Sequence, residues 1–294
     1  MRPFLALALL LAASGLRAAP ALNETLLETA VRHEEAMLRA RLGMAVLDTQ
    51  SAGRWAYRGD ERFPLASTHK AFLCGAVLAM ADRGEVSMRQ TLAIDPAKLL
   101  SWSPVTGQAP PGGRLSLGDL CAAAVSHSDN SAANLLSDAI GGPSALTAFL
   151  RSIGDRQTRL DRQEPDLNEA APGDPRDTTT PLAAAASLEK LLLGDALSAP
   201  ARAALHGWME GDRVADALLR AGLPAGWRIA DKSGAGGHGA RSIIALIRPP
   251  ARPAVVVAIY IAETDAPMPV ADAAIARLGR ALAEALVPSP RPPR

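Results

Sequence analysis

Cysteine is scarce in this chain of 294 residues, and neither sign of charge is in excess. Two cysteines are too few to define a disulfide scaffold, so the fold must depend on a hydrophobic core. With 31 basic and 30 acidic residues, the net charge is +1, which gives no general attraction to nucleic acid or to an anionic membrane. We therefore expect a small molecule as the partner.

Clusters of metal ligands are also missing from the sequence. The five histidines are scattered along the chain, and together with the cysteines they form no group with the spacing of a zinc site. We therefore expect neither a metal nor a cofactor. The histidines are His33, His69, His127, His206 and His238.

Long apolar runs are absent after the N-terminus. The chain begins with a basic residue, Arg2, then a run of Leu and Ala to about Ala13, and then the small residues Ala18 and Ala19. This pattern is typical of a secretory signal, and the run is shorter than the ~20 residues that span a bilayer, which argues against the alternative of a membrane anchor. We expect residues 1–20 to be a cleaved signal peptide and the protein to be secreted into the periplasm.

Export has a consequence for the two cysteines. In an oxidising compartment Cys74 and Cys121 are a candidate disulfide bond. The alternative is a pair of buried free thiols in a reducing cell. A bond here would supplement the hydrophobic core rather than replace it.

Hydrophobic periodicity predicts strands near both ends of the chain and helices between them. The segment from 67 to about 208 consists of Ala- and Leu-rich helical stretches that are broken by Gly and Pro. The expected outer elements are helices at 23–41 and 270–286, a hairpin of strands at 44–48 and 55–57, and strands at 227–230, 242–247 and 254–261.

This order predicts an α/β fold of the α+β type. An antiparallel sheet is built from both chain ends and flanked by helices, and an all-helical lobe is inserted into it, with the active site between the two. Residues 21–65 and 208–287 are expected to form the α/β lobe, residues 66–207 the helical lobe, and residues 288–294 a disordered tail. We see no internal repeat.

The first chemical motif is Ser67-Thr68-His69-Lys70, which begins a helix-like run. One helical turn separates Ser67 from Lys70, so the lysine amine can approach the serine hydroxyl and remove its proton. A serine at a helix N-terminus also presents its backbone N–H to a developing oxyanion. Alone the motif is weak, because a helix cap followed by a surface lysine has the same pattern.

The second motif, Ser128-Asp129-Asn130, lies between two helical runs. The Ser128 hydroxyl can relay a proton to a leaving nitrogen, and the Asn130 amide can bind a substrate carbonyl. By itself this motif is equally typical of a helix-capping loop.

The third motif, Lys232-Ser233-Gly234, ends a predicted strand. A strand edge with a cation, a hydroxyl and a glycine permits close approach of a substrate and offers a partner for its carboxylate. Each motif is modest evidence, but three in this order are strong evidence.

Together the motifs resemble those of the serine penicillin-recognising superfamily, with Ser233 in place of the usual Thr. The segment from Arg162 to Asn168, sequence RQEPDLN, narrows the resemblance to class A β-lactamases, and it extends from about Asn23 to Leu286. Glu164 and Asn168 can hold one water between them, with the carboxylate as the base that activates it. A solvated acidic loop is the alternative reading of that segment alone.

The resemblance implies roles for further residues. The backbone of Ala235 joins that of Ser67 in an oxyanion hole, and Trp102 forms an aromatic wall. Arg241 assists Lys232 with the substrate carboxylate, although a surface arginine is the alternative. It also implies an Arg162–Asp177 ion pair and a bond between Cys74 and Cys121. His69 stands where the family commonly has Phe.

We therefore interpret the chain as a class A serine β-lactamase, a monomer that hydrolyses penicillins and some cephalosporins through an acyl-serine intermediate and confers β-lactam resistance. A penicillin-binding D,D-peptidase shares Ser67, Lys70, Ser128 and Lys232, but the Glu164 segment argues against it. A β-lactam sensor without turnover is the alternative from another class, and it would normally carry a transmembrane tether.

Overall fold

The computed structural model describes residues 22–110, 112–250 and 252–286. The predicted signal peptide and the predicted C-terminal tail lie outside the described residues.

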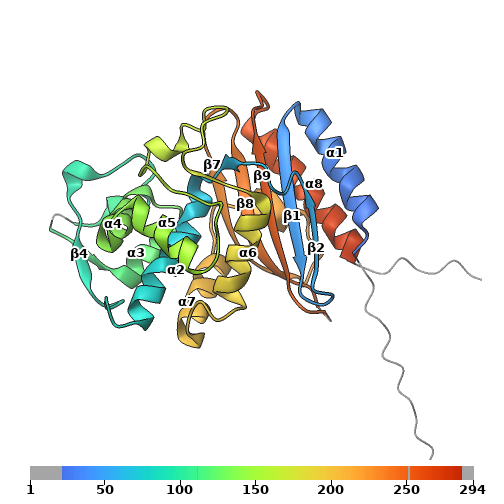
Figure 1. The fold of residues 1–294 in the computed structure, drawn as a ribbon. Helices are drawn as coiled ribbons and strands as arrows, with labels where there is room; N and C mark the ends of the chain where they lie inside the picture. Colours follow the sequence, from blue (N-terminus) through green and yellow to red (C-terminus); the bar gives the residue numbers. More distant parts are fainter. Residues whose placement is uncertain (1–21, 111, 251, 287–294) are drawn as a thin grey trace, which may run out of the picture.

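A five-stranded antiparallel sheet contains strands from both ends of the chain, as predicted (Figure 1). Its order is β2-β1-β9-β8-β7, so the early hairpin lies beside the last strand and β7 forms a free edge. The strands are β1 (Arg41–Asp48), β2 (Gly53–Tyr57), β7 (Arg228–Ala235), β8 (Arg241–Arg248) and β9 (Val255–Ala262).

Both faces of this sheet are buried. Along β9, Val257 and Ile259 join the core on one face, and the alternate residues Val256, Ala258 and Tyr260 join the core on the other. This two-sided burial explains why the strands are continuous apolar runs rather than alternating ones.

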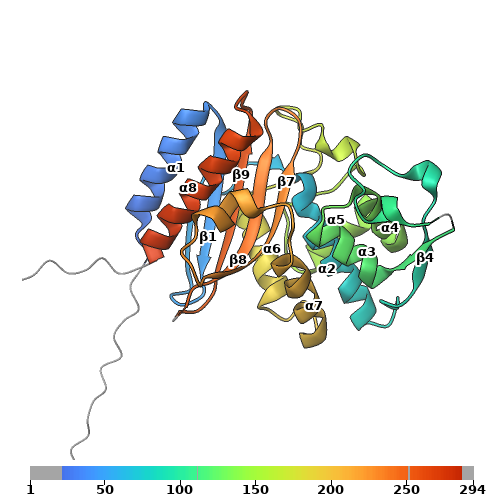
Figure 2. The same cartoon turned by 180° about the vertical axis from the view of Figure 1, so that it is seen from behind.

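Two terminal helices cover the outer face. Figure 2 shows α1 (Glu24–Leu38) and α8 (Met268–Leu286) side by side across it. Asn23 caps α1 by accepting a hydrogen bond from the Leu26 N–H at 3.1 Å, a contribution of about 1 kcal/mol. Both helices begin within two residues of their predicted starts, and α8 ends at the predicted residue. The α1 helix ends at Leu38, about three residues before the predicted end, because Arg39 takes a left-handed conformation and Arg41 begins β1.

The other face packs against α6 (Pro181–Leu192) and the helical part of the molecule. At the centre of the helical part, α2 (His69–Asp82) is buried along nearly its whole length, and α3, α4, α5 and α7 surround it. After its first turn, which carries His69 and Lys70, the buried residues of α2 are apolar on every side. The surrounding helices are α3 (Leu117–Ser126), α4 (Asn130–Ile140), α5 (Pro143–Ser152) and α7 (Ala199–Glu210).

Short elements complete the connections. A two-residue ladder joins β3 (Phe63–Pro64) to β6 (Thr178–Thr179), and a second joins β4 (Thr91–Ala93) to β5 (Arg114–Ser116). The short helical turns are η1 (Ala66–Thr68), η2 (Pro96–Lys98), η3 (Thr106–Gln108), η4 (Asp166–Asn168) and η5 (Asp216–Arg220). No described helix is long and apolar enough to cross a membrane.

The predicted disulfide is wrong for this structure. Cys74 on α2 and Cys121 on α3 are both buried and both free. The Cys74 thiol donates to the backbone carbonyl of Cys121, with the sulfur 3.8 Å from the oxygen, rather than bonding to the other sulfur. Burial raises the pKa of the Cys74 thiol well above its ordinary value, so it packs as a small neutral side chain.

Candidate active site

A cleft of about 470 Å³ opens between the helical part and the free edge of β7. Nine of the predicted site residues line it. The other three, Lys70, Glu164 and Lys232, are buried and contact the lining residues from below, and we call these three the floor of the cleft. The lining residues are Ser67, Trp102, Ser128, Asn130, Asn168, Arg213, Val214, Ser233, Gly234, Ala235, Arg241 and Met268.

Ser67 lies in the short turn η1, which leads directly into α2. The residue before it, Ala66, has φ = 43°, a left-handed conformation that is uncommon for a residue with a Cβ atom. This bend presents Ser67 to the cleft while both of its neighbours are buried. Strain of this kind concentrates at functional sites.

Lys70 contacts several of the other predicted site residues. Its Nζ lies 3.0 Å from Ser67 Oγ, 2.6 Å from Asn130 Oδ1 and 2.9 Å from Glu164 Oε1, and its side chain is fully buried. Burial lowers the pKa of Lys70, and the neighbouring Glu164 carboxylate partly offsets that effect. A lysine with a lowered pKa can act as a base toward the hydroxyl beside it.

Glu164 is held in place by two asparagines. Its backbone N–H donates to Asn134 Oδ1 at 3.0 Å, and the Asn134 amide donates to its carbonyl at 2.8 Å. Asn168 donates its amide N–H to Glu164 Oε2. Burial alone would raise the pKa of Glu164, but the Lys70 ammonium and the Asn168 donor bring it below its ordinary value, so the carboxylate is ionised at neutral pH.

Two oxygen atoms in this group can accept further hydrogen bonds. Glu164 Oε1 lies near the Lys70 ammonium but has no well-directed hydrogen bond, and Asn168 Oδ1 has no partner among the described residues. Both atoms are buried. Unpaired buried oxygens are costly unless a bound molecule satisfies them, and water is the usual one.

The loop that carries Glu164 is pinned at its ends, as the resemblance implied. Arg162 Nε lies 2.6 Å from Asp177 Oδ2, and Asp177 Oδ1 accepts the backbone N–H groups of Asp161 and Arg162. The ion pair joins the two ends of the loop across 15 residues.

The Ser128 motif owes its shape to the buried Asp129. The Asp129 carboxylate accepts from the backbone N–H groups of Val105, Thr106 and Ala132, and so caps α4 and fixes the neighbouring loop. Ser128 consequently takes a left-handed φ of 57°.

Asn130 is engaged inside the protein through both ends of its amide. Its Oδ1 accepts from Lys70, and its Nδ2 donates to the Ser101 carbonyl at 3.0 Å. An amide nitrogen carries two protons, so one donor remains for a substrate carbonyl.

Lys232 belongs to β7, and its side chain is fully buried. Its Nζ donates to Ser128 Oγ at 3.2 Å and to the Ser233 carbonyl at 2.8 Å. Burial lowers the pKa of Lys232 to about 8, with the buried Asp212 and Asp231 acting in the opposite direction. Lys232 therefore carries its charge at neutral pH and links the β7 edge to Ser128.

Gly234 marks the closest approach between β7 and the turn that carries Ser67. A Cβ atom at Gly234 would come within 2.9 Å of the Ser67 backbone nitrogen and 2.7 Å of Ser242 Oγ. Only glycine fits without a shift of the surrounding atoms. Ala235 follows at the free edge and lines the cleft.

Arg241 lines the cleft but is already paired. Its Nε lies 2.6 Å from Asp272 Oδ1 on α8, and its Nη1 donates to the Gly234 carbonyl at 3.0 Å. Arg241 is therefore a buried guanidinium that Asp272 orients, not a solvent-exposed one.

Trp102 and Met268 lie on the exposed rim. The indole is 60% exposed and donates to the His127 carbonyl at 3.1 Å, and Met268 is 56% exposed at the start of α8. Sequence reasoning missed Met268, Val214 and Arg213 among the lining residues, because they belong to no motif.

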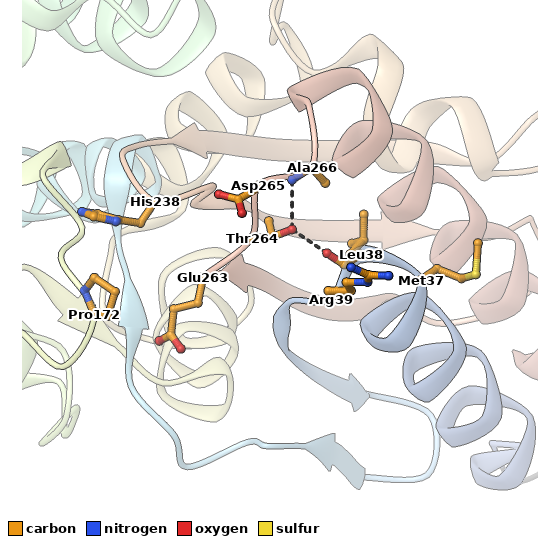
Figure 3. Close-up of a pocket in the computed structure, with 9 residues that line it drawn as sticks. All are labelled: Met37, Leu38, Arg39, Pro172, His238, Glu263, Thr264, Asp265 and Ala266. Carbon is orange, nitrogen blue, oxygen red and sulfur yellow. Dashed lines mark hydrogen bonds between the residues drawn. The ribbon is translucent and has the colours of Figure 1, made fainter.

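A second hollow, of about 370 Å³, lies beyond the turn between β7 and β8 and contains none of the predicted site residues (Figure 3). Hydrogen bonds around this hollow hold the turn in place. The His238 carbonyl accepts the Glu263 N–H at 2.9 Å, and Gly237 donates to the Asn168 carbonyl at 2.8 Å. Thr264 ties the same region to the end of α1 by donating to the Leu38 carbonyl.

Among the described residues, no group of three His, Cys, Asp or Glu side chains is arranged to hold a metal ion.

Comparison with known proteins gives sequence relatives along most of the chain. A sequence model of the β-lactamase enzyme family matches residues 26–286. The β-lactamase AER-1 of Aeromonas hydrophila is 53% identical over 268 residues, which cover 91% of this chain and 88% of the relative. The β-lactamase CARB-3 of Pseudomonas aeruginosa is 48% identical over 255 residues, with 87% and 88% covered.

Solved structures agree with the sequence relatives. An ancestral (GNCA) class A β-lactamase superposes with a TM-score of 0.87 at 52% identity, covering 88% of this chain and 99% of that one. The chromosome-encoded β-lactamase of Vibrio parahaemolyticus gives a TM-score of 0.84 at 45% identity, covering 86% and 96%.

Proposed function

Because this chain belongs to the class A β-lactamases, enzymes that hydrolyse β-lactams, we propose that it opens the lactam ring through a covalent acyl intermediate on Ser67. One observation carries the proposal. Lys70 Nζ lies between Ser67 Oγ and Glu164 Oε1, 3.0 Å from the first and 2.9 Å from the second, with both ionisable side chains out of contact with solvent. Nucleophile and bases are thus assembled before substrate binds.

In the acylation step, the Ser67 oxygen attacks the lactam carbonyl carbon while its proton passes to Lys70, or to Glu164 through a water. The backbone N–H groups of Ser67 and Ala235 stabilise the oxyanion, each contributing roughly 3 to 4 kcal/mol. The carbon–nitrogen bond then breaks, and Ser128 donates its proton to the departing nitrogen. The contact between Ser128 Oγ and Lys232 Nζ supports that last role. Ser128 regains a proton from Lys70, whose Nζ lies 3.5 Å from Ser128 Oγ.

In the deacylation step, a water attacks the ester carbonyl of acyl-Ser67 as Glu164 takes its proton. Glu164 Oε1 and Asn168 Oδ1 are the buried oxygens with spare capacity to accept hydrogen bonds from this water. The ester bond breaks as the proton held by Glu164 passes to the departing Ser67 oxygen, and the product leaves as a carboxylic acid that ionises in water.

Substrate binding is assigned to the β7 edge and the rim. Ser233 and Arg241 line the cleft and bind the substrate carboxylate, and Gly234 allows the ring to approach. The buried Lys232, whose Nζ donates to the Ser233 carbonyl, contributes its positive charge from behind Ser233. The remaining donor of Asn130 meets the side-chain carbonyl, and Trp102 forms the wall beside it. These contacts suit penicillins and some cephalosporins, whose carboxylate adjoins the lactam nitrogen.

The N-terminal signal pattern supports export to the periplasm, and we propose that the mature enzyme acts there as a monomer. We also propose the division into a sheet lobe and a helical lobe at residues 66 and 207. Because α6 lies within that range yet contacts β1, β8 and β9, this helix couples the two lobes.

A chromogenic cephalosporin assay tests the proposed reaction. Purified wild-type protein should give steady turnover that continues for many equivalents, and the Ser67→Ala variant should give none. A burst of one equivalent followed by a stall would instead indicate a D,D-peptidase or a sensor, and would contradict the proposal.

A further inference from the structure

Met268 is an exposed apolar side chain that the reaction steps leave without a role. It is 56% exposed, although methionine is among the residues most often buried. Its place is not arbitrary, because it lines the cleft together with Ser67, Ala235 and Arg241. When an apolar group of the substrate covers an apolar side chain in the cleft, the burial of both surfaces stabilises the complex.

The fold places Met268 beside the cations that we assign to the substrate carboxylate. Met268 and Asp272 are four residues apart on α8, so they share one face of the helix. Asp272 holds the Arg241 guanidinium at 2.6 Å. The start of α8 therefore lies on the carboxylate side of the cleft, and Met268 is the first residue of that helix.

In a cephalosporin, the C3 substituent projects from the carbon next to the one that carries the carboxylate. We propose that Met268 is a specificity-determining residue that packs against a bulky apolar C3 substituent. Val214, a less exposed apolar residue that also lines the cleft, completes the contact. The inference rests on the proposed placement of the carboxylate at Lys232 and Arg241.

The test uses two cephalosporins that share a thienylacetyl group at C7, one with an unsubstituted styryl group at C3 and the other with a methyl group. Each compound is measured directly for kcat/KM, and as a competitor of benzylpenicillin hydrolysis for its apparent inhibition constant. The variants are Met268→Gln, which keeps the length but adds a polar amide, and Met268→Leu, which keeps the apolar character.

For Met268→Gln we expect roughly tenfold weaker use of the styryl compound, mostly through KM, and a change of less than about twofold for the methyl compound. Met268→Leu should stay close to wild type for both. The matched control is Val270→Thr, since Val270 is also exposed in the first turn of α8 but does not line the cleft. It should change neither compound.

Equal losses for the two cephalosporins would show that Met268 acts on the site in general and would overturn the inference. Unchanged kinetics in Met268→Gln would overturn it as well. Failure of the proposed function is distinguishable, because wild-type protein would then show no Ser67-dependent turnover of benzylpenicillin, whatever residue stands at 268.

Discussion

The floor and the rim of the cleft differ in how tightly their side chains are held. On the floor, Lys70, Glu164 and Lys232 are almost fully buried and bound to several partners. On the rim, Trp102 and Met268 are more than half exposed. The floor is thus organised in advance for chemistry, where small displacements are costly, and the rim for recognition, where contacts form with the substrate. We therefore expect floor substitutions to change kcat and rim substitutions to change KM.

The largest effect is expected for Glu164→Ala on the floor. Acylation retains Lys70 as a base, whereas hydrolysis of the acyl-enzyme depends on Glu164, so turnover of penicillin should fall on the order of 10²- to 10⁴-fold. Intact-protein mass spectrometry should show one persistent penicillin adduct, which Ser67→Ala abolishes. Asp166→Ala is the matched control, because that exposed carboxylate lies two residues away. Rapid steady turnover by Glu164→Ala would remove Glu164 from deacylation.

Gly234→Ala tests whether the reaction requires the close contact between β7 and the turn that carries Ser67. The added methyl group would lie 2.9 Å from the Ser67 backbone nitrogen, so the turn or the strand must shift. Overpacking of this kind costs about 1–3 kcal/mol, and we expect kcat/KM to fall roughly tenfold or more.

Gly207→Ala is the control for Gly234→Ala. Gly207 lies in α7 with nothing within 4 Å of its added Cβ, so this change should stabilise the helix by ~0.5–1 kcal/mol and leave activity unchanged. Thermal unfolding and penicillin kinetics measure both variants. Wild-type kinetics in Gly234→Ala would mean that the β7 edge is not rigid.

Arg241→Ala should act on substrate recognition. It removes one of two cations assigned to the carboxylate, a charge-assisted hydrogen bond worth ~1.5–3 kcal/mol, so kcat/KM for penicillin should fall about ten- to hundredfold, mostly through KM. Because Asp272 already shares the guanidinium charge, we expect the lower end of this range. A fall confined to kcat would indicate that Arg241 acts on the reaction steps and not on substrate binding.

The smallest effect at neutral pH is expected for Lys232→Arg, because the substitution keeps the positive charge. The informative measurement is therefore the dependence of kcat/KM on pH. With its pKa lowered to about 8, Lys232 is charged below that pH and neutral above it, so wild-type kcat/KM for penicillin should decline as pH rises through about 8. Arginine stays charged, so the variant should keep its activity to higher pH. If kcat/KM of the variant falls at the same pH as that of the wild type, the loss of activity at high pH would be due to Lys70 and not to Lys232.

Much of this site was readable from the sequence because its signals are local. Ser67 and Lys70 are one turn apart, and the caps at Asn23 and Asp129 depend on neighbours within three residues. The three motifs and the Glu164 segment identified the family, and nine of the predicted residues do line one cleft.

Other features depended on contacts between segments far apart in the chain. Asp272 orients Arg241 across 31 residues, and the pairing of Asn130 with Lys70 spans 60. Met268 and Val214 line the same cleft as Ser67, although they lie about 200 and about 150 residues from it in the sequence, because the folded chain brings these segments together. No periodicity in the sequence contains this information.

The sequence alone was sufficient to predict the strands of the main sheet, the flanking helices, the family and the residues able to do the chemistry, because helix period, capping and motif spacing are properties of nearby residues. It did not predict the short strands β4, β5 and β6, which lie within the segment that was expected to be all-helical. The tertiary structure alone decided which of the chemical groups are buried and which pairs meet. It left Cys74 and Cys121 as free thiols, and it lowered the pKa values of Lys70 and Lys232. The reason is that desolvation depends on everything packed around a group, and that packing exists only after distant segments have come together.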